Sequence, residues 1–171
     1  QDFHRGGTRT VEYAYNDFNI ATVAKGLGKL EIASRYYDQA NNWQNLWRDI
    51  SNNGSTGFIM PRNADGSWVD TINCDLSDAP RESIDYHPLA RDWPRCVCWW
   101  CGFLYEASSW EYSLYVPHDV TSLVVKSGGT VAFRRRLDTL FDSDFYNVGN
   151  EPSFLSPTLY HWIGRPDLSS N

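Results

Sequence analysis

Residues 105–119 concentrate the side chains of this sequence that could carry out chemistry. The stretch reads YEASSWEYSLYVPHD, and it combines carboxylic acids and a histidine with several aromatic rings. Carboxylic acids give and take protons, and aromatic faces stack on the apolar faces of sugar rings. The combination suits chemistry on glycosidic bonds, in which an Asp or Glu protonates the leaving oxygen.

Helical spacing relates three of these side chains. Trp110 follows Glu106 by four residues, so in a helix the two side chains lie on the same face. The indole would then be a platform for a sugar ring or a wall that removes water from the carboxylate. The alternative is an ordinary core tryptophan. Glu111 would point elsewhere on the helix, and we expect it at the surface or paired with a base.

His118 and Asp119 follow Pro117, a residue that favours the first turn of a helix. In a functional interpretation both side chains bind sugar hydroxyls. In a structural interpretation Asp119 caps the helix and His118 is a buried imidazole with satisfied hydrogen bonds. The sequence favours neither interpretation over the other.

The composition is that of a globular domain rich in aromatic residues. The 171 residues suffice for one domain with a core; 42% are hydrophobic, 21% are charged and eight are tryptophan. A net charge of −6 argues against a nucleic-acid partner, because phosphate binding needs a basic face. The one basic run, residues 134–136, is expected to be a solvated helix face with salt bridges. No window approaches the roughly 20 apolar residues of a membrane span.

The four cysteines, Cys74, Cys96, Cys98 and Cys101, favour disulfides in a secreted protein over a zinc site. Only the last two have the Cys-x-x-Cys spacing of zinc ligands, and the connectivity of the disulfides stays open. The glycosylation sequon Asn53-Gly54-Ser55 points to the same extracellular location.

The N-terminal part of the chain is predicted to form two antiparallel helices. Apolar residues recur with helical spacing up to a stop signal at Gly26, and Thr8 or Thr10 is a candidate cap for the start. A second helix is predicted from Glu31 to about Trp47. Its predicted inner face consists of Ile32, Tyr36, Ala40, Trp43 and Trp47. The short glycine-containing link makes the pair antiparallel.

Residues 51–103 are predicted to form a long irregular loop, because glycines and prolines break every periodic pattern there. Loops of that length are usually functional or disordered. The tryptophans and cysteines in its second half favour an ordered loop.

Helical patterning returns at about Ser108 and is interrupted at Pro117. Three helices are predicted after it: one that ends at Gly128, one capped by Thr130, and a short one over residues 154–162. The predicted apolar stripe of the middle helix is Val131, Phe133, Leu137, Leu140 and Phe141. The predicted fold class is therefore all-α. Antiparallel helix pairs joined by long loops build α/α toroids, which keep their active sites in the loops.

The sequence resembles glycoside hydrolase family 92, the calcium-dependent exo-α-mannosidases. Six blocks carry the resemblance in order along the chain, and the strongest are residues 105–119 and the GNEPSF of residues 149–154. The others are TVEYAYNDF (10–18), NWQNLW (42–47), TGFIMPR (56–62) and LYHWIGRP (159–166). The resemblance implies an (α/α)6 barrel, of which residues 1–171 would be a partial catalytic domain truncated at both ends. The cysteine-rich stretch around Cys96 matches nothing general in the family.

By this resemblance, Glu106 is the general acid. It would need a raised pKa in order to stay protonated until it meets the glycosidic oxygen. Phe103, Tyr105 and Trp110 are the candidates for the apolar surroundings that raise it. Without the resemblance, Glu106 would be an ordinary glutamate favoured by the dipole of a helix N-terminus.

Asn150 and Glu151 lie in a turn that the resemblance places near the leaving-group sugar and the calcium region. We expect both to contact substrate, and we treat a metal role for this turn as secondary, because two oxygen ligands are too few for a calcium site. Family members specific for α-1,2 linkages carry a His at position 150, so the Asn leaves the linkage specificity open.

The function implied for the parent protein is inverting hydrolysis of terminal α-linked mannose in glycans. Calcium is the implied cofactor, with most of its ligands outside this chain. The general base of the family belongs to an Asp-rich segment downstream of residue 171. We therefore expect the chain alone to be inactive and to need the rest of the catalytic domain. The alternative is a carbohydrate-binding or inactive remnant. A secreted location is expected, with neither nucleic acid nor membrane as a partner.

Overall fold

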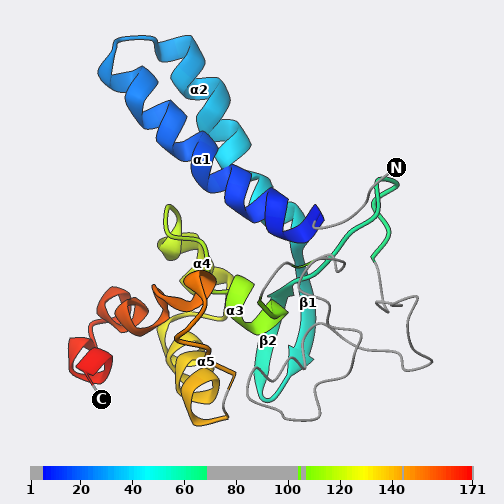
Figure 1. Ribbon diagram of the computed structural model, residues 1–171, viewed down its shortest axis with the longest axis vertical. Coiled ribbons are helices and arrows are strands. Elements are labelled where there is room, and N and C mark those ends of the chain that lie inside the picture. The colour runs from blue at the N-terminus through cyan, green and yellow to red at the C-terminus, as the bar shows by residue number, and fades with distance from the viewer. Residues whose placement is uncertain (1–5, 69–103, 105–106, 144, 171) are drawn as a thin grey trace.

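The computed structural model describes residues 6–68, 104, 107–143 and 145–170. Helices dominate this part of the chain. One two-stranded antiparallel sheet lies there at the lower end of the N-terminal helical arm and beside the C-terminal group of helices (Figure 1). All four cysteines lie outside the described residues, so the predicted disulfides stay a prediction.

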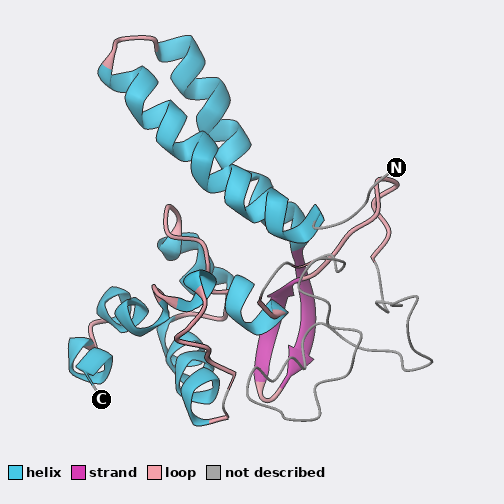
Figure 2. Cartoon of the chain, viewed as in Figure 1, coloured by secondary structure: helices cyan, strands magenta, loops and turns pink. Residues whose placement is uncertain are grey.

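The helical arm consists of α1 (Gly6–Gly26), α2 (Leu30–Gln39) and the 3-10 helix η1 (Ala40–Leu46). The two α-helices run antiparallel and pack on each other, as the sequence predicts (Figure 2). Neither Thr8 nor Thr10 caps α1, because the helix already begins at Gly6; the Thr10 hydroxyl instead donates to the Gly6 carbonyl at 2.8 Å.

The predicted second helix is divided into two elements. Its α-helical part ends at Gln39, a tighter 3-10 helix follows, and Trp47 begins a strand. Ile32, which the pattern predicts on the inner face, is 38% exposed, and its neighbour Ala33 is buried instead. A small side chain at this position lets the two helix backbones approach closely.

Strands β1 (Trp47–Asn52) and β2 (Ser55–Ile59) form an antiparallel hairpin, so the predicted irregular segment is wrong for residues 51–59, and the mostly helical fold includes this small sheet. Asn53 and Gly54 make the two-residue turn, with φ angles of 43° and 76°. Asn-Gly is the preferred pair for such turns, because both positions require left-handed backbone. The exposed turn also carries the first residue of the sequon.

The helices after the hairpin complete the core. They are α3 (Ser109–Tyr112), α4 (Val120–Lys126), α5 (Thr130–Asp142), η3 (Glu151–Ser153), η4 (Ser156–Ile163) and η5 (Pro166–Ser170). Of these, α3 and α5 contact β2 directly. Thr130 is the first residue of α5 and not its cap. The cap position is held by Gly129, and no side chain makes a capping hydrogen bond there. Val131 is 83% exposed and does not belong to the apolar stripe, whereas Phe133, Leu137 and Leu140 are buried as predicted.

Arg136 of α5 is buried, which corrects the prediction that the basic run is a solvated face. Its guanidinium donates to the carbonyls of Thr56, at 3.0 Å, and of Gly57 in β2. It also lies over the ring of Phe58, 4.5 Å from the centroid. Burial lowers the pKa of Arg136 to about 9, so the group is still a cation at neutral pH. Arg134 behaves as predicted and pairs with Asp138 at 3.4 Å on the surface.

Candidate functional site

Helix α3 begins at Ser109 behind a capping box made by Ser108 and Glu111. The Ser108 hydroxyl accepts from the Glu111 main-chain amide at 3.3 Å, and the Glu111 carboxylate accepts from the Ser108 amide at 2.8 Å. The pattern Ser-x-x-Glu is the sequence signature of this arrangement. It fixes the backbone of Ser108, which follows Glu106 by two residues in the sequence.

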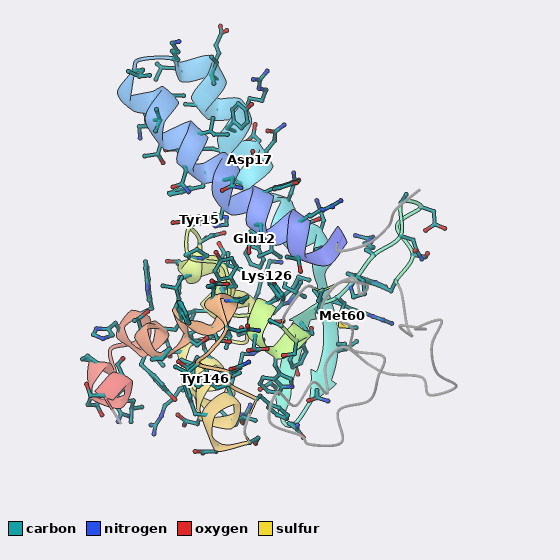
Figure 3. The ribbon with its side chains drawn as sticks, viewed as in Figure 1. Glu12, Tyr15, Asp17, Met60, Lys126 and Tyr146 are labelled. Atoms are coloured by element: carbon teal, nitrogen blue, oxygen red, sulfur yellow. The ribbon has the colours of Figure 1, made fainter. Side chains whose placement is uncertain are left out.

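Two serine hydroxyls hold α3 against the end of β2. Ser109 Oγ donates to the Ile59 carbonyl at 2.5 Å, and the Ile59 amide donates to Ser113 Oγ at 2.7 Å. Ser109 Oγ also lies 3.5 Å from the sulfur of Met60, which Figure 3 shows where the chain leaves β2. These hydrogen bonds to the hairpin therefore fix the position of the short helix.

Glu111 is fully buried, which overturns the prediction of a surface or base-paired side chain. One carboxylate oxygen accepts from the Ser108 main chain, and the other accepts from the Ser153 hydroxyl at 2.5 Å. Burial raises the pKa of Glu111, and the hydrogen bonds from Ser153, Ser108 and the Asn147 main-chain amide oppose the rise. Because it accepts hydrogen bonds from Ser108 and from Ser153, the Glu111 carboxylate joins the start of α3 to the end of η3.

The titration of Glu111 predicts a pH dependence of stability. In the unfolded chain this carboxyl has the ordinary pKa of 4.5, and in the folded chain the pKa is higher. The protonated carboxyl of Glu111 therefore stabilises the folded state fully below pH 4.5. This stabilisation is lost as the pH rises through the pKa that Glu111 has in the folded state. Glu111→Gln cannot titrate. Its melting temperature should therefore rise relative to that of the wild type between pH 4 and pH 7, and a difference independent of pH would contradict this.

The turn with Asn150 and Glu151 is well tied to its surroundings. The side-chain oxygen of Asn147 accepts from the Gly149 amide at 3.0 Å, and the Asn147 carbonyl accepts from the Asn150 amide at 3.1 Å. Asn150 is buried, whereas the side chain of Glu151 at the start of η3 is exposed. Glu151 is thus presented to solvent from a fixed backbone.

Trp110 lies in the core. Its ring stacks on Phe145 with centroids 5.0 Å apart and meets Phe58 edge-on at the same distance. Its indole N–H donates to the Asn52 side chain of β1 at 2.9 Å. These contacts agree with the structural interpretation of this tryptophan, and its contact with sugar stays a prediction.

Asp119 has the role of the structural interpretation, whereas His118 fits it only in part, because the side chain is half-buried and no described residue is a hydrogen-bond partner of its Nδ1. His118 Nε2 lies 2.9 Å from the Ala40 carbonyl, and the ring packs against Phe18 and against Tyr15, which projects from α1 (Figure 3). Burial lowers the pKa of His118, which favours the neutral imidazole. Asp119 caps α4 by accepting from the Ser122 amide at 3.3 Å. Sugar binding by either residue stays a prediction.

Glu106 lies outside the described residues, as do Phe103 and Tyr105. Helix α3 begins only at Ser109, so the one-turn relation predicted between Glu106 and Trp110 is not a relation within this helix. What the structure brings together is the start of α3 and the turn of residues 147–153, the two segments with the strongest resemblance.

Calcium binding stays a prediction for the part of the chain that the structure describes. No group of three or more His, Cys, Asp or Glu side chains gathers there in a way that could hold a metal ion. Among the same residues, no helix has the length and apolar character needed to cross a bilayer.

Comparison with known proteins identifies the fold. An inverting mannosidase of Bacteroides thetaiotaomicron, BT2199, is 27% identical with a TM-score of 0.71, and the match covers 95% of this chain and 22% of that one. The α-mannosidase BT3965 of the same organism, solved with mannoimidazole, is 25% identical with a TM-score of 0.75, over 97% of this chain and 21% of its own. A protein of Arthroderma benhamiae described as an uncharacterized secreted glycosidase is 38% identical, over 97% of this chain and 21% of its own length.

The similarity to these proteins places the chain in the catalytic domain of a glycoside hydrolase. All 171 residues match the Glycosyl hydrolase family 92 catalytic domain, and the chain belongs to this family. It spans about a fifth of the length of the curated relative.

Proposed function

We propose that the complete enzyme hydrolyses terminal α-linked mannose with inversion of configuration, and that Glu106 is its general acid. The observation that carries the proposal is the match of the whole chain to family 92, together with two solved relatives that are named as mannosidases, one of them as inverting. The name of the curated relative supports a secreted enzyme. We further propose that the helix pairs described here form part of an (α/α)6 barrel in the complete domain.

In this proposal Glu106 protonates the oxygen of the leaving sugar while a base activates water on the opposite face of the mannose ring. Inversion requires the acid and the base to be about 6.5–9.5 Å apart, so that water fits between them. The base would come from the rest of the domain, and we therefore expect the 171-residue chain alone to be inactive. We expect most ligands of the calcium ion that the family implies to come from outside this chain.

Release of mannose by the complete enzyme, in calcium and in chelator, tests the proposal directly. Substrates are α-mannosyl disaccharides and aryl α-mannosides. Inverted configuration of the released mannose, followed by NMR, separates this function from retaining hydrolysis. An enzyme that binds these sugars without cleaving them would overturn the proposal and favour a carbohydrate-binding protein.

Glu151 gives the proposal a sharper prediction. Its exposed carboxylate on a fixed turn is suited to contact the sugar beyond the scissile bond. A lost charge-assisted hydrogen bond costs about 1.5–3 kcal/mol, or roughly ten- to a hundredfold in kcat/KM. Glu151→Ala should therefore weaken the cleavage of disaccharides to this extent and spare aryl mannosides, which lack that sugar. Equal losses on both substrates would mean that Glu151 acts on the mannose or on a metal.

A further inference from the structure

The buried carboxylate of Glu111 has no part in the proposed mechanism and does more than a capping box requires. One oxygen, Oε2, already completes the box with Ser108 at 2.8 Å. The second oxygen, Oε1, accepts from the hydroxyl of Ser153, which is 42 residues away in sequence. Capping glutamates normally lie at the surface, where water hydrates the second oxygen, so burial at 0% exposure calls for another reason.

The hydrogen bonds of Glu111 converge on the turn that carries Asn150 and Glu151. Ser153 ends η3 directly after this turn, and the Asn147 main-chain amide, which precedes it, also bonds to Glu111. One carboxylate therefore holds both ends of a short segment. Both oxygens of Glu111 are thus engaged, so the segment is fixed against α3 and, through Ser109 and Ser113 at the two ends of α3, against β2.

We propose that Glu111 is a positioning residue for the leaving-group sugar, because it holds the 147–153 turn so that Glu151 points at that sugar. The inference rests on the proposed function, and in particular on the contact of Glu151 with substrate. Glu111 touches no substrate itself. It sets the position of the residue that does.

The complete enzyme with Glu111→Ala tests the inference. We expect kcat/KM for α-mannosyl disaccharides to fall roughly ten- to a hundredfold, mainly through KM, because the contact of Glu151 is lost. Aryl α-mannosides should change by less than about threefold, since they make no such contact. Glu111→Gln can still accept from Ser108 and exchange a hydrogen bond with Ser153, so it should restore most of the lost activity on disaccharides.

A double substitution separates positioning from a merely structural role. If Glu111 acts through Glu151, the variant with both Glu111→Ala and Glu151→Ala should cleave disaccharides no more slowly than Glu151→Ala alone. Additive losses would overturn the inference. Ser153→Ala removes one hydroxyl and no charge, so it decides the question if Glu111→Ala does not fold: a disaccharide-selective loss supports the inference, and an unchanged ratio of the two substrates overturns it.

Tyr160→Phe is the matched control. It removes a partly buried hydrogen bond of similar kind, from the Tyr160 hydroxyl to Asp138 at 2.9 Å, but between α5 and η4. This variant should leave the ratio of disaccharide to aryl activity unchanged. A wild-type enzyme that releases no mannose would overturn the proposed function and this inference together. An active wild type whose substrate ratio is unaffected by Glu111→Ala would overturn the inference alone.

Discussion

Glu106→Gln should remove most of the turnover of the complete enzyme on unactivated mannosides. The glutamine amide keeps the size of the side chain and cannot deliver a proton to the leaving oxygen. General acid catalysis contributes about 10²–10⁴-fold, so the loss in kcat should fall in this range. Steady-state kinetics on an α-mannosyl disaccharide measure it.

Leaving-group dependence distinguishes an acid from a residue that only shapes the site. Aryl mannosides with good leaving groups need little protonation, so Glu106→Gln should affect them much less. Glu31→Gln on α2 removes an exposed carboxylate and is the matched control. Equal losses on both kinds of substrate would count against Glu106 as the acid.

Gly57→Ala should cause a large loss of stability in the hairpin. The backbone at Gly57 has a φ of 86°, and an added Cβ would lie 2.3 Å from the ring of Trp47. Left-handed backbone costs about 1–2 kcal/mol for a residue other than glycine, and overpacking a core costs about 1–3 kcal/mol. The sum of about 2–5 kcal/mol is a large share of a typical stability of about 5–15 kcal/mol.

Gly54→Ala provides the control for this prediction. Gly54 has a similar φ of 76°, but nothing lies within 4 Å of its added Cβ. It should therefore cost only the backbone strain of about 1–2 kcal/mol. Thermal unfolding of the two variants separates strain from steric clash. If both lose the same stability, Trp47 moves aside without cost and the prediction is wrong.

The helices were predictable from sequence because their signals are local. Apolar spacing and glycine stops describe α1 and α5 within a few residues, whereas α2 ends at Gln39 and not near Trp47 as predicted. The hairpin was also predictable, since Asn53-Gly54 is a strong turn signal. The polar residues on both sides of this turn, however, resemble an irregular loop.

The buried polar residues were not predictable in this way. Glu111 and Arg136 look like surface residues in sequence, and each is buried because of partners far along the chain. Ser153 is 42 residues from Glu111, and Thr56 is 80 residues from Arg136. The Ser-x-x-Glu pattern at Ser108 predicts the cap of α3, but no local pattern predicts what the second oxygen of Glu111 binds.

The serine contacts at the end of β2 have a consequence for synthesis of the protein. The Ile59 amide and carbonyl are satisfied by side chains that lie 54 and 50 residues later in the chain. At elongation rates of about 5–20 residues per second, the ribosome needs roughly 3–11 s to add the residues up to Ser113. During that interval the nascent hairpin has an unpaired strand edge, the feature that invites pairing with another chain. The order in which the segments are made thus leaves this edge dependent on solvent or chaperones until α3 is complete.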